Sequence, residues 1–376
     1  MPLYRYLSDM PHRPDSDDYS ALFLHDIPLM DVRAPVEASK GAFPNSENIP
    51  LLDDEQRHLI GIRYKEAGEE KAIQLGLELA TPEIREQRYS EWKRFCGQHP
   101  KGYLYCFRGG LRSRTTQQWL AEQGYEYPLI KGGYKAMRRF LLDQLDQSLA
   151  STQFISIAGP TGSGKTRALK QIYHHVDFEG LAHHRGSAFG RNPLDTQPSN
   201  IDWENAVSIE MLKHRHFYPD ARLFVEDEGR LIGRVCMPPN VEKMCKTNQL
   251  VVLEESLENR VQMTREDYID SHWLEYQSLF GELAEERFSS FVLDALFRIK
   301  KRLGGERHKT LHADFSEALT HFFSTGNSEG FNDGIALLLN QYYDPMYTYQ
   351  FSKREGSVVF RGNGEEVIHW ANGESM

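Results

Sequence analysis

Residues 159–166 read Gly-Pro-Thr-Gly-Ser-Gly-Lys-Thr and satisfy the Walker A pattern G-x4-G-K-[ST]. The apolar run 154–158 precedes this segment, and the run 166–173, which has a helical pattern, follows it. Between a strand and a helix, such glycines let consecutive backbone N–H groups turn toward phosphate oxygens. The segment therefore predicts a phosphate-binding loop (P-loop) in an α/β domain with a parallel sheet.

Each part of this loop has an expected role. We expect the backbone at Gly159, Gly162 and Gly164 to bind phosphate oxygens and Lys165 to reach the outer phosphates. Thr166 is the residue that would hold Mg²⁺ if the ion accompanies the phosphates, and no other metal ligand is certain from the sequence. The loop recognises a diphosphate but does not identify the group attached to it.

Acidic residues follow two strand-like runs in the second half of the chain. Glu226 and Asp227 come after the run 223–225, and a second acidic pair follows the run 250–253. Ligands of parallel sheets bind beyond the carboxyl ends of the strands, so we expect Glu226 and Asp227 to serve the P-loop site. The alternative is a solvated acidic turn.

The length of 376 residues and the pattern of apolar runs predict two domains. Residues 19–146 alternate strand-like and helix-like runs and contain a charged helical insertion at 53–100, where Thr81 and Pro82 mark a helix start. Residues 150–376 form the second α/β domain and continue into a helical C-terminal part. In this part we expect helices near 256–268, 272–303 and 329–343, and edge strands at 358–360 and 367–370.

Composition limits the class of protein. Acidic residues outnumber basic ones by 54 to 44, and the formal net charge is −10, so a generally basic nucleic-acid coat is excluded. No apolar run approaches the ~20 residues that span a bilayer, and the first residues lack the order of a secretory signal. We therefore expect a cytoplasmic protein without membrane association. The four cysteines form no disulfide framework and no C-x2-C zinc pattern.

Cys106 begins the segment Cys-Phe-Arg-Gly-Gly-Leu-Arg-Ser, which lies between a strand-like run and a helix-like run. A helix start together with Arg108 and Arg112 favours the thiolate, which is the nucleophilic form of cysteine. We expect Cys106, Arg108 and Arg112 to form a catalytic loop, with a buried inert cysteine as the alternative. The other three cysteines lack such surroundings and are expected to be structural.

Five segments of the first domain resemble, in order, the motifs of rhodanese domains, which handle persulfide or perselenide on a cysteine. The segments are 31–37, 41–44, 48–51, 106–113 and 129–134. The spacing Cys-x5-Arg is one residue longer than in the usual sulfurtransferase loop and is similar to that of phosphatases. Such a wider loop suits a tetrahedral anion related to phosphate, which argues against plain thiosulfate sulfurtransferase activity.

The whole chain resembles the family of bacterial tRNA 2-selenouridine synthases. The resemblance rests on a rhodanese-like α/β domain followed by a P-loop NTPase-like α/β domain, and on the segments 183–190, 226–233, 253–260 and 342–347. It implies a transferase that acts on tRNA carrying 2-thiouridine at the wobble position. A geranyl group from geranyl diphosphate is first attached to sulfur, and selenium from selenophosphate then replaces the geranylthio group. No tightly bound cofactor is implied.

A tRNA substrate must dock on local basic clusters of this acidic chain. The densest cluster contains Lys300, Lys301 and Arg302, and its alternative is a solvated helix face. His184 and Arg185 are expected to contact substrate. Several aromatic side chains are expected to stack a base or line a geranyl channel, with core packing as the alternative: Phe189, Tyr268, Trp273, Tyr342, Tyr343 and Tyr347.

Three other functions stay open on the sequence alone. The strongest is a P-loop kinase or NTPase fused to a sulfur-relay rhodanese, which nucleotide turnover stimulated by substrate would favour. A Cys-x5-Arg phosphatase with a regulatory nucleotide-binding domain is the second, although no acidic general-acid loop can be assigned. The third is a non-enzymatic tRNA-binding module, against which the intact Cys106 and Lys165 argue.

Overall fold

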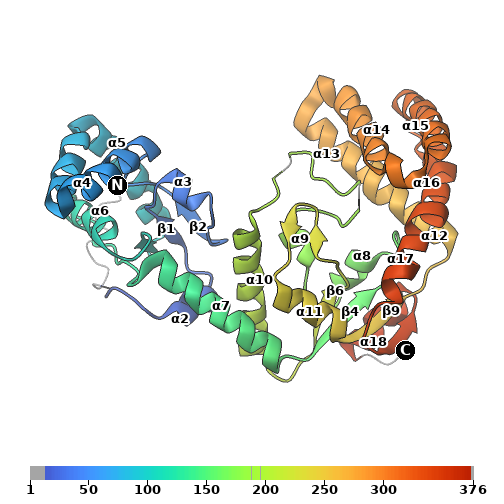
Figure 1. The fold of residues 1–376 in the computed structure, drawn as a ribbon, viewed down its shortest axis with the longest axis horizontal. Helices are drawn as coiled ribbons and strands as arrows, with labels where there is room; N and C mark the ends of the chain where they lie inside the picture. Colours follow the sequence, from blue (N-terminus) through green and yellow to red (C-terminus); the bar gives the residue numbers. More distant parts are fainter. Residues whose placement is uncertain (1–12, 188, 195, 374–376) are drawn as a thin grey trace, which may run out of the picture. The chain divides into compact units, whose positions relative to one another are not determined.

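The computed structural model describes residues 13–187, 189–194 and 196–373, which form two compact units (Figure 1). The first unit runs to Ser148 and also contains Ser199–His216, whereas the second contains Leu149–Pro198 and the residues from Phe217 onward. Both units are mixed α/β structures with parallel sheets, which confirms the predicted fold class. The first residues, in which we expected no secretory signal, lie outside the described part of the chain up to residue 12.

The first unit is built on a parallel sheet with strand order β2-β1-β3. A parallel bridge between Leu104 and Leu129 adds a further extended segment beside β3. The strands are β1 (Leu29–Asp31), β2 (Ser46–Asn48) and β3 (Tyr103–Tyr105). The helices are α2 (Tyr19–Leu24), α3 (Pro35–Ala38), α4 (Asp54–Leu79), α5 (Pro82–Gln98), α6 (Leu111–Glu122), α7 (Gly133–Ser151) and α10 (Asn200–Phe217).

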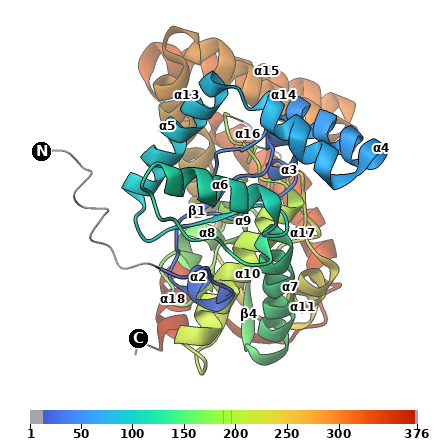
Figure 2. The same cartoon turned by 90° about the vertical axis from the view of Figure 1, so that its left-hand side faces the viewer.

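The helical insertion consists of α4 and α5, as the sequence predicted (Figures 1 and 2). Thr81 caps α5, because its hydroxyl accepts a hydrogen bond from the Ile84 N–H at 3.4 Å and Pro82 occupies the first turn. Gly68 interrupts α4 with a φ of 80°, a backbone conformation that favours glycine. The two halves of α4 then pack together, so that a Cβ added at Gly76 would lie 3.4 Å from Cδ1 of Ile60.

The position of helix α10 differs from the sequence-based division, which treated 150–376 as one continuous domain. Ile209 and Leu212 of α10 are buried in the same hydrophobic cluster as Leu141 of α7. Asn205 accepts a hydrogen bond from Arg138 at 2.9 Å, and the two helices lie side by side in both views (Figures 1 and 2). Burial of these apolar side chains places α10 with the first unit.

The second unit contains a five-stranded parallel sheet with the order β10-β9-β4-β6-β5. Strand β4 is central, so the P-loop that follows it and the acidic segment that follows β6 emerge at the same edge. The strands are β4 (Phe154–Ala158), β5 (His175–Val176), β6 (Leu223–Glu226), β9 (Gln249–Leu253) and β10 (Val358–Gly362), with a separate pair, β7 (Leu231–Ile232) and β8 (Val235–Cys236).

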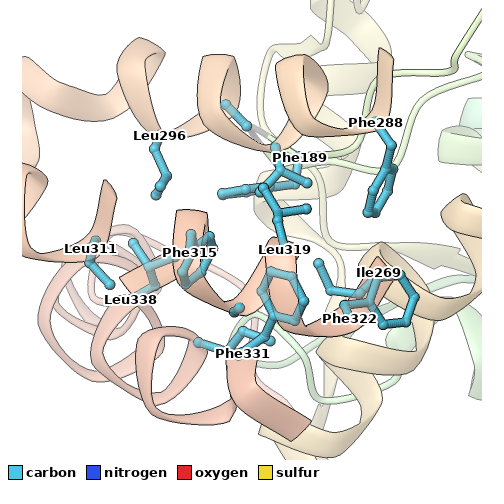
Figure 3. Close-up of a cluster of buried hydrophobic side chains, with 14 of the residues drawn as sticks. Phe189, Ile269, Phe288, Leu296, Leu311, Phe315, Leu319, Phe322, Phe331 and Leu338 are labelled. Carbon is cyan, nitrogen blue, oxygen red and sulfur yellow. The ribbon is translucent and has the colours of Figure 1, made fainter. Parts of the chain in front are cut away.

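Helices surround this sheet and form a bundle on one side of the P-loop. They are α8 (Lys165–Leu169), α9 (Phe178–Leu181), α11 (Pro239–Thr247), α12 (Leu257–Arg265), α13 (Ser271–Phe280), α14 (Ala284–Leu303), α15 (Gly305–Thr325), α16 (Asn332–Leu338), α17 (Asp344–Phe351) and α18 (Gly364–Asn372). Figure 3 shows the buried core of the bundle, where Phe189 of the 183–194 loop lies among Phe288, Phe315 and Leu319. Trp273 and Tyr342 pack against the same core, so packing accounts for these aromatic residues.

Two predicted elements differ from the structure. The predicted strand at 367–370 is wrong, because these residues belong to α18. The side chain of Asn363 accepts from the Glu366 N–H and the Glu366 carboxylate accepts from the Asn363 N–H, which is a helix-starting pair. The predicted edge strand at 358–360 is confirmed as β10. Helix α8 ends at Leu169, and the rest of the predicted run 166–173 continues as turns.

Candidate active sites

Cys106 follows β3 at the base of its loop and is 3% exposed. Its Sγ lies 3.2 Å from Oγ of Ser113. The Ser113 hydroxyl donates to the Gly110 carbonyl at 3.0 Å, which leaves its oxygen able to accept from the thiol. The loop thus positions the cysteine with a specific polar partner at the start of α6.

The Gly-Gly pair at 132–133 packs directly on the cysteine loop. Gly132 and Gly133 have φ values of 72° and 57°. A Cβ added at Gly133 would lie 2.6 Å from the backbone nitrogen of Gly109 and would also collide with the Cys106 carbonyl. That carbonyl accepts from the Tyr134 N–H at 2.9 Å. Only glycine permits this backbone approach, so two of the rhodanese-like segments form one site.

The two arginines of the loop have different surroundings. Arg108 is exposed. Arg112 forms an ion pair with Glu37, and its Nη2 donates to Oε1 of Glu37 at 3.2 Å. Burial would raise the pKa of Glu37, but the hydrogen bond from Arg112 and its positive charge hold that pKa below its usual range. Sequence reasoning did not single out Glu37, although it lies in a rhodanese-like segment.

A buried ion pair lies among the segments that surround the cysteine loop. Nη2 of Arg33 lies 2.6 Å from Oδ2 of Asp31, and both residues are almost fully buried. The same nitrogen donates to the Gly41 carbonyl at 2.8 Å, and the guanidinium lies 3.9 Å from the centre of the Tyr134 ring. Arg33 therefore joins three rhodanese-like segments that are separate in the sequence.

The P-loop borders a cavity of about 430 Å³ in the second unit. Gly162 and Gly164 have φ values of 80° and 76°, a backbone conformation that favours glycine. Nζ of Lys165 donates to the Gly159 carbonyl at 2.8 Å. The Thr166 hydroxyl donates to Oε2 of Glu179 at 3.2 Å, so Glu179 joins the site as a residue that the sequence did not predict.

The two predicted carboxylates, Glu226 and Asp227, have different surroundings. Glu226 is fully buried, and its Oε2 accepts from the Phe178 N–H at 2.7 Å, so it positions α9 and does not line the cavity. Asp227 lines the cavity and forms an ion pair with Arg354. Burial raises the pKa of Glu226, and the nearby Asp177 adds to this effect.

Asp227 and Glu228 are neighbours in the cavity wall but have different partners. Burial raises the pKa of Asp227, and the charge of Arg354 opposes that rise. Burial also raises the pKa of Glu228, and Glu179 raises it further. The described residues include no group of three or more His, Cys, Asp or Glu side chains that could hold a metal ion by themselves.

An apolar wall lines the same cavity as the P-loop. It contains Tyr268, Tyr343, Met346, Tyr347 and Phe351. A smaller apolar cavity of about 30 Å³ is lined by Thr161 and Tyr343, which also line the first cavity, together with residues of the bundle core such as Phe315. The P-loop and these side chains therefore line one cavity, and three of the predicted tyrosines contribute to it.

His184 and Arg185 line a second cavity of about 310 Å³, which shares Thr166, Glu179 and Tyr268 with the first. The guanidinium of Arg185 lies 5.9 Å from the centre of the Tyr268 ring. The predicted basic cluster lies elsewhere, because its members are exposed in the last turn of α14 and line neither cavity: Lys300, Lys301 and Arg302. None of the helices in the described ranges is long and apolar enough to cross a membrane.

Comparisons with known proteins cover both units. Residues 152–376 match the family described as tRNA 2-selenouridine synthase AAA domain. A tRNA 2-selenouridine synthase of Marinobacter nauticus is 50% identical over 96% of this chain and 98% of its own length. Those of Alcanivorax borkumensis and Hahella chejuensis are 48% and 46% identical over 96% and 94% of this chain, and over 99% and 93% of their own lengths. With such identity over nearly its whole length, the chain belongs to the tRNA 2-selenouridine synthase family.

Proposed function

We propose that this chain converts 2-thiouridine at the wobble position of tRNA to 2-selenouridine in two steps, each at its own centre. The second unit attaches a geranyl group to the sulfur, and the cysteine loop of the first unit directs the replacement of the geranylthio group by selenium. The observation that carries the proposal is the cavity that the P-loop lines together with the apolar wall of Tyr343, Tyr347 and Phe351. This combination suits a ligand with a diphosphate at one end and a hydrocarbon chain at the other.

In the first step, the thiouridine sulfur bonds to C1 of the geranyl group as the bond from C1 to the diphosphate oxygen breaks. The proton on N3 of the base leaves to solvent, and diphosphate departs. Lys165 and the loop amides stabilise the negative charge that develops on the leaving oxygen. Mg²⁺ is usually held by one or two carboxylates together with substrate phosphates. Thr166, Glu179 and Glu228 are the residues that would hold it here, where it would neutralise the diphosphate.

In the second step, selenium of selenophosphate bonds to C2 of the uracil ring as the bond from C2 to sulfur breaks. Geranylthiol leaves, water takes up the phosphoryl group as phosphate, and N3 is protonated again. Arg108 and the amides of the cysteine loop bind the tetrahedral anion, with Cys106 next to the selenium. The exposed position of Arg108 supports this role, while Glu37 holds Arg112 at the rim of the loop.

A group of basic residues beside the second cavity supports the binding of tRNA phosphates. Burial lowers the pKa of His184, and the charges of Arg191 and Arg298 lower it further. Burial and the charge of Arg191 likewise lower the pKa of Arg298. Positive groups that repel one another within an acidic chain are stabilised by an anion, and phosphate contacts are the main source of affinity for nucleic acids.

Mass spectrometry of nucleosides tests the proposal. A tRNA that carries 2-thiouridine is incubated with the purified chain and geranyl diphosphate, and selenophosphate is added afterwards. We expect S-geranyl-2-thiouridine first and 2-selenouridine after the second addition. An unchanged tRNA, together with tRNA-stimulated hydrolysis of ATP or GTP, would overturn the proposal in favour of a P-loop NTPase fused to a sulfur-relay domain.

A further inference from the structure

A large groove lies in the first unit between the two halves of α4 and the start of α6. Its volume is about 650 Å³, within the range of about 300–1,000 Å³ typical of small-molecule sites. Most of its wall is hydrocarbon, contributed by Ile60, Ile62, Ile73, Leu77, Leu111 and Trp119. This groove is separate from the P-loop cavity, because it consists only of first-unit residues.

Several apolar side chains of the groove wall are exposed to solvent, and a bound hydrocarbon chain would bury them. Ile62 is 40% exposed, Leu77 is 52% exposed and Leu111 is 52% exposed. These residues gather on one surface although they come from separate segments of the chain. Contiguous apolar surface of this kind marks a binding site more often than isolated exposed residues do.

One end of the groove is the rim of the cysteine loop. Leu111 and Arg112 belong to that loop and also line the groove. Glu37 closes the same end, where it pairs with Arg112 and lies 3.7 Å from Nε of Arg57. Charged groups therefore lie where the groove meets the loop, and most of the remaining wall is apolar although Lys65, Glu69 and Arg88 also line it. This suits a ligand whose reacting end is polar and whose other end is a hydrocarbon chain.

We propose that this groove binds the geranyl chain of S-geranyl-2-thiouridine while selenium replaces the geranylthio group. The inference rests on the function proposed above and adds a recognition site for the group that leaves in its second step. The groove is continuous with the cysteine loop, and this continuity favours the geranyl chain as its ligand. The C2–S bond that breaks must lie at the loop, so the geranyl chain on the sulfur extends away from the loop into the groove. Such a groove would let the second centre distinguish the geranylated base from unmodified 2-thiouridine.

Substitutions on α4 test the groove with a matched control. Ile62→Gln changes a residue of the groove wall, and Leu59→Gln changes a residue with the same 40% exposure three positions away that does not line it. Leu77→Gln changes the opposite half of α4. The full chain is assayed with selenophosphate and an RNA carrying either S-geranyl- or S-methyl-2-thiouridine, and the geranylation step is measured separately with geranyl diphosphate.

We expect Ile62→Gln and Leu77→Gln each to raise KM for the S-geranyl RNA about tenfold, the size of effect that a small change in apolar contact produces. The same variants should leave KM for the S-methyl RNA and the geranylation step unchanged, and Leu59→Gln should behave as the unsubstituted chain. Direct binding of geraniol in the presence of saturating geranyl diphosphate, which occupies the P-loop cavity, should weaken in the same two variants when followed by calorimetry.

The outcomes separate this inference from the function on which it rests. If the unsubstituted chain converts the S-geranyl RNA but all three variants share its KM, the groove does not bind the geranyl chain. The same conclusion follows if the groove variants change only the oligomeric state in sedimentation, because the groove would then be a contact between copies of the chain. If the unsubstituted chain does not convert the S-geranyl RNA, the proposed function itself fails.

Discussion

Arg260 donates hydrogen bonds to both carboxylate oxygens of Asp344, from Nη2 to Oδ1 at 2.5 Å and from Nη1 to Oδ2 at 3.0 Å. The Nε of Arg260 donates to the Thr161 carbonyl at 2.9 Å. Thr161 belongs to the P-loop, and Asp344 begins α17, the helix that carries Tyr347 of the aromatic wall. This arrangement joins the P-loop to the helix that carries part of the apolar wall. The two residues lie in segments 253–260 and 342–347, which the family resemblance had singled out without indicating that they meet.

Asp344→Asn should weaken this link. Arg260 is 6% exposed, so its charge would lose a buried partner at a cost of about 2 kcal/mol in the free energy of unfolding. KM for geranyl diphosphate should rise more than kcat falls, because the P-loop and the apolar wall would no longer be held at a constant separation. Urea unfolding and geranylation kinetics measure both effects. The exposed Asp333→Asn is the control, and equal behaviour of the two variants would contradict the positioning role.

Lys165→Ala and Cys106→Ala should affect different steps. We expect Lys165→Ala to lower the rate of geranylation at least about a hundredfold, as loss of a group that stabilises developing charge does, and to leave selenation of a pre-geranylated RNA intact. Cys106→Ala should show the reverse pattern. Nucleoside mass spectrometry of each half-reaction measures this, with Lys243→Ala and Cys96→Ala as controls. Equal loss of both steps in both variants would argue against two separate centres.

His272 should make the protein less stable in mild acid. It is 3% exposed on α13, and burial, together with the charge of Arg185, lowers its pKa from 6.5 to about 3. Between these values the unfolded chain binds a proton that the folded chain does not. The contribution of the neutral ring to the free energy of unfolding is therefore complete above pH 6.5 and is lost as the pH falls toward 3.

At pH 5 this loss amounts to about 2 kcal/mol, since each pH unit within the window is worth about 1.4 kcal/mol. His272→Gln should remove that part of the pH dependence of the free energy of unfolding, measured in urea at pH 7 and pH 5. The exposed His321→Gln should not change it. An unaltered pH dependence in His272→Gln would show that the ring is not the group responsible.

Glu226→Gln should stabilise the second unit at alkaline pH. Burial and the nearby acidic residues raise the pKa of Glu226 above its ordinary value of 4.5. The favourable contribution of the protonated carboxyl group to the free energy of unfolding is therefore complete below pH 4.5 and is lost as the pH rises. A glutamine oxygen can still accept from the Phe178 N–H, whereas Glu226→Leu leaves that donor unsatisfied at a cost of about 1–3 kcal/mol. Thermal unfolding at pH 5 and pH 8 compares the variants. A less stable Glu226→Gln at pH 8 would refute this account.

Arg191→Ala should weaken tRNA binding and reduce its salt dependence. Arg191 lines the second cavity next to His184, and loss of one phosphate contact lowers the slope of log affinity against log salt by about 1. Filter binding across a salt series measures the slope. Lys301→Ala provides the comparison from the basic cluster on α14. A changed slope in Lys301→Ala alone would place the tRNA surface at that cluster.

Features that depend on neighbouring residues were predictable from the sequence. The strand, P-loop and helix at 154–169 follow directly from one another, and the cap of Thr81 on Ile84 spans three residues. Such hydrogen bonds and backbone conformations are set within a few positions, because glycine and short polar side chains act on the adjacent backbone. The segment 367–370 is the exception, since its apolar run masked the helix start formed by Asn363 and Glu366.

Contacts between distant segments were decided by tertiary packing. Arg112 and Glu37 are 75 residues apart, and Arg260 and Asp344 are 84 apart, yet each pair closes a site. The return of α10 to the first unit and the groove beside the cysteine loop likewise depend on which apolar faces are buried together. The residue types disclosed a P-loop and a cysteine loop, but which side chains complete them depends on folding, because burial is a property of the packed chain and not of a local pattern.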